Sequence, residues 1–320
     1  MYCNPVYFLP CVKDNENRVN SIIFVPMRKD YTVAGHTFSL ISEDSGPALP
    51  DLSQYDAFAV PEGSESPLFT LRVVDRLPSV DPRIVLDQDT EPGETKLRLF
   101  TCDDGWYCEA SLTSSHPVAA KLLMSRDARS AQLEICSQEH ALFAINNSLM
   151  LQYAFSTATL GTLEMQASVI AQGGKGYLFL AKSGTGKSTQ SRMWLKAIEG
   201  SRLLNDDNPI VRLMPDGSLR VFGSPWSGKT PCYRNESYPV GAFVRIRRCS
   251  ENRAVRLGVL EAYSSIYSSC SGFKADRAMG DGLHSTIEKA VSKTACFVLD
   301  CLPDEDAARV CYKAVKEADL

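Results

Sequence analysis

A glycine-rich stretch, residues 181–189 with the sequence AKSGTGKST, lies between the apolar run 177–180 and a segment with helical periodicity over 188–198. A strand, a glycine-bearing turn and a helix in this order are typical of a P-loop, whose backbone amides surround a phosphate at the N-terminus of the helix. The usual pattern G-x-x-x-x-G-K-[ST] begins here with Ala181, and the two glycines closest to the lysine are present. The stretch predicts an α/β fold that binds a nucleotide; an ordinary surface loop without a ligand is the alternative.

The polar residues of this stretch suit a magnesium nucleotide such as ATP. Lys187 would supply a mobile positive charge near the phosphates, and Ser188 would supply a hydroxyl ligand for Mg²⁺. Glycine at the turn lets the backbone N–H groups wrap the β-phosphate. The residues predicted to bind the cofactor are Ser183, Gly184, Thr185, Gly186, Lys187, Ser188 and Thr189.

Two adjacent carboxylates, Asp206 and Asp207, end a short apolar run soon after this stretch. One of them could contact Mg²⁺ while the other accepts a proton from a substrate hydroxyl, and both tasks serve phosphoryl transfer. Asp206, together with Ser188, is predicted as a metal ligand, and both aspartates with Lys187 as the catalytic group. The sequence leaves open which aspartate is the base. A turn or cap role before Asn208 is the alternative.

A second strand is expected over 167–171, joined to the strand 177–180 by the glycine-rich link 173–176. A link of this length and composition favours an antiparallel hairpin. The hairpin, residues 183–189 and the aspartate pair together resemble the C-terminal domain of the HPr kinase/phosphorylase family. The fold of that family is shared with the nucleotide-binding part of ATP-dependent phosphoenolpyruvate carboxykinase. The resemblance covers residues 164–302.

Two further motifs, at 223–231 and 301–304, are similar to a bacterial branch of HPr-kinase-like proteins. This branch includes kinases that phosphorylate a serine of a precursor peptide. The resemblance implies that both aspartates line an active site. Kinases of the family usually carry a histidine on the strand before the loop; the matching residue here is Gln166, which can donate a hydrogen bond but cannot carry a proton.

The loop 226–234 is predicted to lie on the substrate side of the site. Its Ser-Gly-Lys-Thr sequence looks like the end of a second P-loop, but Pro231 would interrupt the helix that should follow. Lys229 and Arg234 are candidates for contacting the transferred phosphoryl group or an acidic substrate group. With Gln166 they form the predicted substrate set; an ordinary basic loop is the alternative.

The predicted organisation is a β-rich N-terminal module of unknown role over residues 1–135 and an HPr-kinase-like nucleotide-binding domain over 136–320. The fold class is therefore α/β, with a P-loop domain of the HPr kinase/PEP carboxykinase type preceded by a β-rich domain. The elements expected from patterning are strands at 21–25, 69–74, 96–100, 106–110, 203–205, 240–246 and 295–299, a hairpin over 210–222, and helices within 141–163, at 257–269, at 276–291 and after Asp304.

The composition, 44% hydrophobic and 22% charged residues, is that of an ordinary globular protein. No secretory signal is apparent, and the uncharged run 141–163 is too polar to span a membrane unaided. The net charge of −4 and the lack of a basic motif argue against nucleic acid as a partner. The eleven cysteines include no C-x₂-C pair, so buried reduced thiols in a cytoplasmic protein are expected.

The leading functional hypothesis is an ATP- and Mg²⁺-dependent kinase that transfers the γ-phosphate to a hydroxyl, with serine expected, of a peptide or small protein. Homo-oligomerisation is left open. The second hypothesis is a small carboxykinase acting on a carboxylate metabolite, although the chain is short for that enzyme. The third is a sensor or scaffold that binds ATP without catalysis, which Gln166 and Ala181 favour. Label transfer from ATP and enolpyruvate formation from oxaloacetate would distinguish them.

Overall fold

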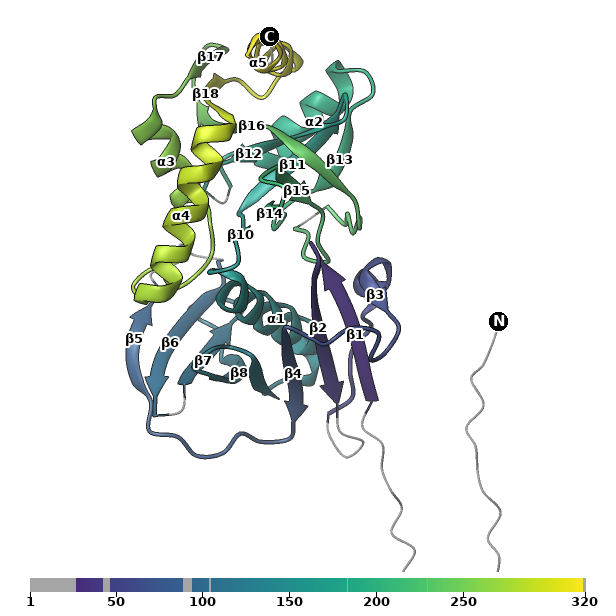
Figure 1. Cartoon of the computed structure of the whole chain (residues 1–320), viewed down its shortest axis with the longest axis vertical. Helices are drawn as coiled ribbons and strands as arrows, with labels where there is room; N and C mark the ends of the chain where they lie inside the picture. Colours follow the sequence, from purple (N-terminus) through teal and green to yellow (C-terminus); the bar gives the residue numbers. More distant parts are fainter. Residues whose placement is uncertain are drawn as a thin grey trace, which may run out of the picture.

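The computed structural model describes residues 27–42, 47–88, 94–103, 105–182, 184–228 and 230–318. Within these residues the chain forms two nine-stranded sheets and five α-helices, a mixed α/β architecture (Figure 1). The strand expected over 21–25 lies outside the described residues.

The first sheet is built from the chain before residue 136. Its strands are β1 (Met27–Val33), β2 (His36–Ser42), β3 (Ala59–Val60), β4 (Phe69–Val74), β5 (Arg83–Asp87), β6 (Lys96–Cys102), β7 (Gly105–Ser111), β8 (Val118–Ser125) and β9 (Ser130–Ile135), in the order β3-β1-β2-β4-β9-β8-β7-β6-β5. Two short 3₁₀-helices, Ser53–Phe58 and Gln138–His140, flank them. β4 is parallel to both β2 and β9, and the other pairs are antiparallel. The strands expected at 69–74, 96–100 and 106–110 are confirmed as β4, β6 and β7.

Helix α1 (Ala141–Thr157) packs against β4, β8 and β9 of the first sheet and against β10 of the second. It lies between the two sheets in Figure 1, which explains its uncharged sequence. Its buried Gln152 donates hydrogen bonds to the carbonyl oxygens of Thr70 and Ala128. The expectation of a helix within 141–163 is confirmed only to Thr157, because Gly161, with φ of +67°, turns the chain into β10.

The second sheet follows α1. Its strands are β10 (Thr162–Glu164), β11 (Ala167–Gln172), β12 (Lys175–Leu180), β13 (Arg202–Asn205), β14 (Ile210–Leu213), β15 (Leu219–Phe222), β16 (Ser237–Arg248), β17 (Arg253–Arg256) and β18 (Ala295–Cys301), in the order β10-β14-β15-β16-β12-β11-β13, with β18 also beside β16 and β17 beside β18. The long β16 pairs first with antiparallel β15 and then lies between the parallel strands β12 and β18. The antiparallel hairpin β11–β12 is confirmed; Gly173 and Gly174 have φ of +57° and +76°, as a two-residue type I′ turn requires.

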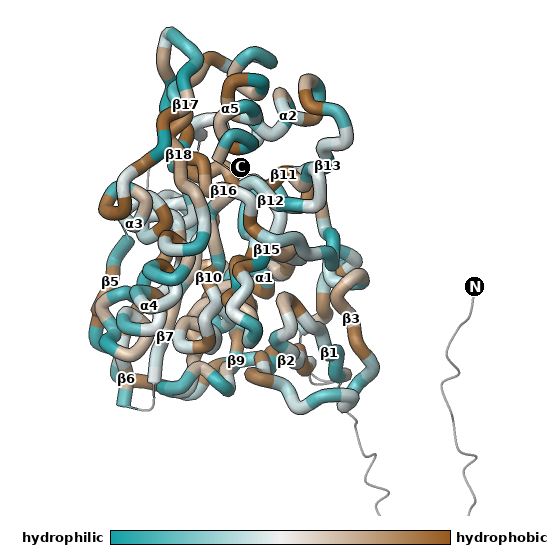
Figure 2. Tube along the Cα trace, turned by 45° about the horizontal axis from the view of Figure 1, so that its top comes forward, coloured by the Kyte–Doolittle hydropathy of each residue, from teal (hydrophilic) through white to brown (hydrophobic). Residues whose placement is uncertain are grey.

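Four helices cover the two faces of this sheet. Trp194 of α2 (Lys187–Ala197) and Cys311 of α5 (Glu305–Glu317) share a buried cluster with Phe179 of β12, whereas Ile266 of α3 (Val259–Tyr267) shares the other cluster with Leu178. Neighbouring strand residues point to opposite faces, so α2 and α5 lie on one face and α3 and α4 (Arg277–Lys293) on the other. Figure 2 shows hydrophobic residues along β18, which these helices cover. The side chain of Asp304 accepts a hydrogen bond from the Ala307 amide and caps α5, as expected.

The contact between α4 and the end of α1 gives a stability prediction. A Cβ at Gly282 would lie 2.4 Å from the carbonyl oxygen of Ala158 and 2.8 Å from the Cα of Thr159. Alanine for glycine inside a helix normally stabilises by about 1 kcal/mol. We expect Gly282→Ala instead to lower the free energy of unfolding by about 1–3 kcal/mol, because backbone must move away from backbone. Urea denaturation beside Ser285→Ala, an exposed position of the same helix, tests this; equal stability of the two variants would contradict the close approach.

Candidate functional site

The loop between β12 and α2 has the backbone conformation that its glycines were expected to permit. β12 ends at Leu180 and α2 begins at Lys187. Gly184 and Gly186 have φ of +71° and +126°, values that side chains disfavour. A Cβ at either position would meet nothing within 4 Å, so the requirement is conformational rather than steric. Ser183, predicted to bind the cofactor, lies outside the described residues.

An arginine of the neighbouring strand β16 holds this loop. Arg248 donates from Nε to the carbonyl oxygen of Thr185 at 3.0 Å and from Nη2 to that of Gly184. Both carbonyl groups therefore point toward β16. Ser188 and Thr189 are half-buried in the first turn of α2.

Lys187 is buried, with 8% of its surface exposed, and its Nζ donates to the carbonyl oxygen of Ala181 at 3.1 Å. Burial lowers the pKa of Lys187, and the charges of Asp207 and Asp206 partly oppose that shift. A lysine ammonium is costly to bury without a counter-charge. The structure thus brings the predicted lysine and both predicted aspartates into one electrostatic group.

Asp206 is fixed in the interior between the hairpin and α2. Its Oδ1 accepts a hydrogen bond from Ser168 Oγ at 2.7 Å, and Ser168 in turn lies 2.6 Å from Ser191 Oγ of α2. The other oxygen, Oδ2, is buried and has no hydrogen-bond partner among the described residues. A buried carboxylate oxygen without a partner is unfavourable, so Asp206 is suited to receive a cation or a hydrogen-bond donor.

Asp207 follows on the turn and is less deeply buried. Burial raises the pKa of Asp207, the charge of Asp206 acts in the same direction, and Lys187 opposes it. The buried Asn205 holds the turn, because its Oδ1 accepts from the amides of Asp207 and Asn208, both at 2.9 Å. Asn205 was not predicted to have a role. An asparagine directly before two acidic residues is a local signal for a turn of this kind.

The loop over 226–234, predicted to lie on the substrate side of the site, runs beside Asp207. A Cβ at Gly228 would lie 3.1 Å from the Cβ of Asp207, so the loop passes directly over this aspartate. Lys229 lies outside the described residues. Arg234 is exposed and forms an ion pair with Glu236 at 3.7 Å rather than with either aspartate.

A cation that the sequence analysis did not single out is Arg245. It reaches from β16 to α3, where it donates to Ser265 and to the hydroxyl groups of Ser268 and Ser269 at 2.9 Å. Burial lowers the pKa of Arg245, and its charge in turn helps to lower that of Lys187. No ion pair neutralises Arg245 within the described part of the chain, so it can contact an anion near Lys187.

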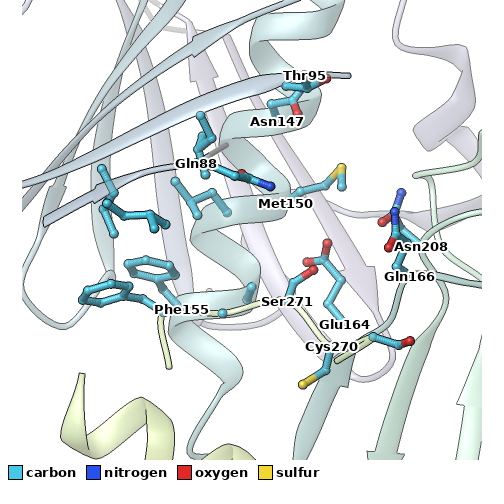
Figure 3. Close-up of a pocket in the computed structure, with 18 of the residues that line it drawn as sticks. Gln88, Thr95, Asn147, Met150, Phe155, Glu164, Gln166, Asn208, Cys270 and Ser271 are labelled. Carbon is cyan, nitrogen blue, oxygen red and sulfur yellow. The ribbon is translucent and has the colours of Figure 1, made fainter. Parts of the chain in front are cut away.

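A cavity of about 840 Å³ opens beside Asp207 (Figure 3). Its walls come from β5, β6, α1 and residues 268–273, so both sheets contribute to it. Gln166 is exposed and lines this cavity. Its backbone amide donates to the carbonyl oxygen of Ser269 at 2.7 Å. Glu164 also lines it and projects beside Ser271 in Figure 3.

Glu164 is the most perturbed carboxyl group of the site. Only 2% of its surface is exposed, and Oε2 has no hydrogen-bond partner among the described residues. Burial raises the pKa of Glu164 to about 8, and the charge of Asp207 adds to the shift. The sequence offered no signal for this, because Glu164 lies in an unremarkable strand and its burial depends on α1 and residues 268–273.

This shift predicts a pH dependence of stability. The unfolded chain releases the Glu164 proton near pH 4.5, whereas the folded protein retains it to about pH 8. The stabilisation is complete below the lower pKa and is lost as the pH rises through the upper one. The free energy of unfolding of wild type, relative to that of Glu164→Gln, should fall by roughly 2–4 kcal/mol between about pH 5 and about pH 8.5. Urea denaturation without metal or nucleotide measures this. The titratable and charged neighbours Asp207, Tyr153 and Arg212 are common to both proteins, and parallel pH profiles would contradict the assignment.

Three wider properties concern the described residues alone. No helix among them has the length and hydropathy of a membrane span. No group of three or more His, Cys, Asp or Glu side chains in that part of the chain could hold a metal ion alone. The nine cysteines described there are free thiols, seven of them buried.

This chain has little detectable similarity to known proteins. The sequence matches no family model and no curated protein. Among solved structures, the HPr(Ser) kinase/phosphatase from Coxiella burnetii is similar over 49% of this chain and 94% of that chain, with a TM-score of 0.28 and 10% sequence identity. A likeness this weak assigns neither a family nor an activity to this chain.

Proposed function

We propose that this protein is a kinase that transfers the γ-phosphate of ATP to a hydroxyl group of a peptide or small protein. The observation that carries the proposal is the meeting of Lys187, Asp206 and Asp207 beside a glycine loop at the start of a helix. Phosphoryl transfer needs positioning, positive charge and a proton acceptor more than covalent chemistry. These residues supply each of them.

The loop and the start of α2 would bind the phosphates. The amides of residues 184–188 lie where the loop enters α2, and the positive end of the helix dipole favours an anion. Lys187 and Arg245 would hold negative charge on the transferred group. Asp206 and Ser188 would hold Mg²⁺, since Oδ2 of Asp206 is buried with no partner in the described part of the chain and Oδ1 is fixed by Ser168. When bound, Mg²⁺ would neutralise phosphate charge; it commonly keeps few protein ligands, in agreement with the small number of acids here.

Asp207 would accept the proton of the acceptor hydroxyl. Asp207 is partly exposed and is one of the residues that line the cavity, so it would be accessible to a second substrate, whereas Asp206 is almost completely buried. Burial raises the pKa of Asp207, which makes the carboxylate a stronger base than an exposed aspartate. The two adjacent aspartates therefore have different surroundings and are suited to different tasks.

The direct test is transfer of label from γ-labelled Mg·ATP to a lysate or a peptide library, with Asp207→Asn as the control. We expect labelled serine with the wild-type protein and none with the variant. ATP binding with no labelled product would favour the sensor hypothesis. Enolpyruvate formation from oxaloacetate and ATP would favour the carboxykinase hypothesis.

A further inference from the structure

The ionisable residues that line the cavity beside Asp207 are all acidic, apart from a cysteine. Three carboxyl groups line it, those of Glu94, Glu164 and Asp207. Its lining residues, as far as the structure describes them, include no lysine, arginine or histidine. The remaining surface combines uncharged polar groups with an apolar wall that includes Phe155 and Phe273. A negatively charged ligand would therefore be repelled, whereas a cation with an aliphatic body would be complementary.

Glu164 gives this cavity a specific polar contact. Its side chain is almost entirely buried, lines the cavity, and has an Oε2 atom with no hydrogen-bond partner among the described residues. Its backbone is held firmly, because its carbonyl oxygen accepts from the amide of Ser271 at 2.9 Å and the next amide, that of Met165, donates to Pro209 at 3.0 Å. An ammonium group beside Glu164 would favour the ionised carboxylate over the protonated form that Glu164 otherwise retains, because an opposite charge lowers the pKa of a carboxyl group. A fixed, buried carboxylate oxygen without a donor among the described residues is suited to receive one from such a ligand.

Glu164 and Asp207 belong to one rigid unit. The amide of Ala167 donates to the carbonyl oxygen of Asp207 at 2.9 Å, which ties the strand that follows Glu164 to the aspartate turn. Asp207 interacts electrostatically with Lys187 on one side and with Glu164 on the other. A ligand that contacts Glu164 can therefore extend to Asp207, at the border with the proposed phosphate site.

We propose that this cavity binds the phosphate acceptor through a protonated amine held by Glu164, which places the acceptor hydroxyl at Asp207. The inference rests on the proposed kinase function and adds a substrate class, a hydroxyl compound that carries an alkylammonium group. In the transfer, the hydroxyl oxygen forms a bond to the γ-phosphorus, its proton passes to Asp207, and the bond from that phosphorus to the β-bridging oxygen breaks to release ADP. The ammonium stays at Glu164 throughout.

The alkylammonium can come from a lysine side chain of a peptide or from a free amino alcohol. Two matched probe series distinguish these sources. The first compares the peptides Ala-Ser-Lys-Ala, Ala-Ser-Gln-Ala and Ala-Ser-Glu-Ala, blocked at both ends. The second compares 3-aminopropan-1-ol, butan-1-ol and 3-hydroxypropanoate. Binding is measured by calorimetry on the full chain without nucleotide or metal, so that it does not depend on turnover.

We expect the cationic member of at least one series to bind, with the neutral and anionic members at least about tenfold weaker. Glu164→Gln should reduce binding of the cation by about tenfold or more, whereas Glu199→Gln, at an exposed position of the chain, should not. Binding confined to the peptide series would identify a basic peptide, and binding confined to the alcohol series a small amine. Equal binding within each series, or an unchanged affinity of Glu164→Gln, would overturn the inference.

A second pair of variants keeps the inference testable if Glu164→Gln fails to fold. Met150 lines the same cavity from α1 and is half-buried. Met150→Lys would bring its own ammonium into the cavity and should abolish binding of the cationic probe, whereas Met150→Gln should largely retain it. If Met150→Lys and Met150→Gln reduced binding of the cationic probe equally, the cavity would not recognise its ligand by charge. Selective amine binding without any label transfer from ATP would leave the amine site standing and reject the kinase function.

Discussion

Lys187→Ala is expected to lower the affinity for Mg·ATP by at least about 100-fold. The ammonium group is buried and interacts with both aspartates, and Arg245 is a second cation whose charge acts on it, so loss of Lys187 removes much of the charge that would hold the phosphates. It also leaves Asp206 and Asp207 facing each other with less compensation, which raises the cost of bringing in a further anion. Isothermal titration calorimetry with a non-hydrolysable ATP analogue and Mg²⁺ measures the change.

The matched control is Lys196→Ala, an exposed lysine near the end of the same helix. This variant also loses one positive charge, but not from the loop, so its affinity for the nucleotide analogue should equal that of wild type. Circular dichroism shows whether each variant is folded. If Lys187→Ala bound the nucleotide as tightly as Lys196→Ala, the loop before α2 would not be the phosphate site.

Asp207→Asn is expected to reduce the rate of phosphoryl transfer by roughly 10²- to 10⁴-fold while changing ATP affinity far less. Asparagine keeps the shape and the neighbouring hydrogen bonds but cannot accept the proton of a hydroxyl group. Asp206→Asn should also impair turnover, and we expect its defect to be eased by raising the Mg²⁺ concentration, because its proposed task is to hold the ion. Single-turnover kinetics with the acceptor identified by label transfer separates the two effects.

Asp281→Asn, at an exposed position on α4, controls for the loss of one negative charge and should leave turnover unchanged. Normal phosphorylation by both active-site variants would show that the chemistry occurs elsewhere. A loss of ATP binding as large as the loss of turnover in Asp207→Asn would instead assign that residue to nucleotide binding.

Local signals explain what the sequence could predict. The glycine turn of the hairpin, the loop before α2 and the Asp304 cap depend on residues close together in the chain, and each is present in the structure. The strands β1, β2, β3, β5, β8, β9, β10 and β17 were not expected. In β5 every residue is exposed and in β2 nearly every residue is buried, so neither shows the alternation that marks a half-buried strand.

The helix expected over 257–269 shows how tertiary pairing changes a local pattern. Residues 253–256 form β17 against β18, and the amide of Leu257 still donates to the carbonyl oxygen of Cys296. The helix α3 can begin only after Gly258, whose amide is capped by the side chain of Glu261 at 3.2 Å. The strand partner lies far along the chain, so the local sequence could not indicate it.

The candidate site was predictable where it is local and not where it joins distant segments. Lys187 and the two aspartates were recognised from their motifs. Arg245 alternates along β16 with Arg247, which forms an exposed ion pair with Asp300, so the local sequence does not distinguish the buried arginine from the exposed one. The cavity beside Asp207 could not be foreseen, since it needs β5, β6, α1 and residues 268–273 at once.

The position of β16 between two parallel strands has a consequence for synthesis of the protein. Its neighbours β12 and β18 lie on opposite sides of it in the sequence, and β18 ends at Cys301. While the ribosome is still making residues before Ala295, β16 lacks its partner β18, and Arg248, which contacts the loop before α2, lies on an open edge of the sheet. The proposed phosphate loop therefore cannot have its neighbouring strand fully paired until the chain has been made through Cys301.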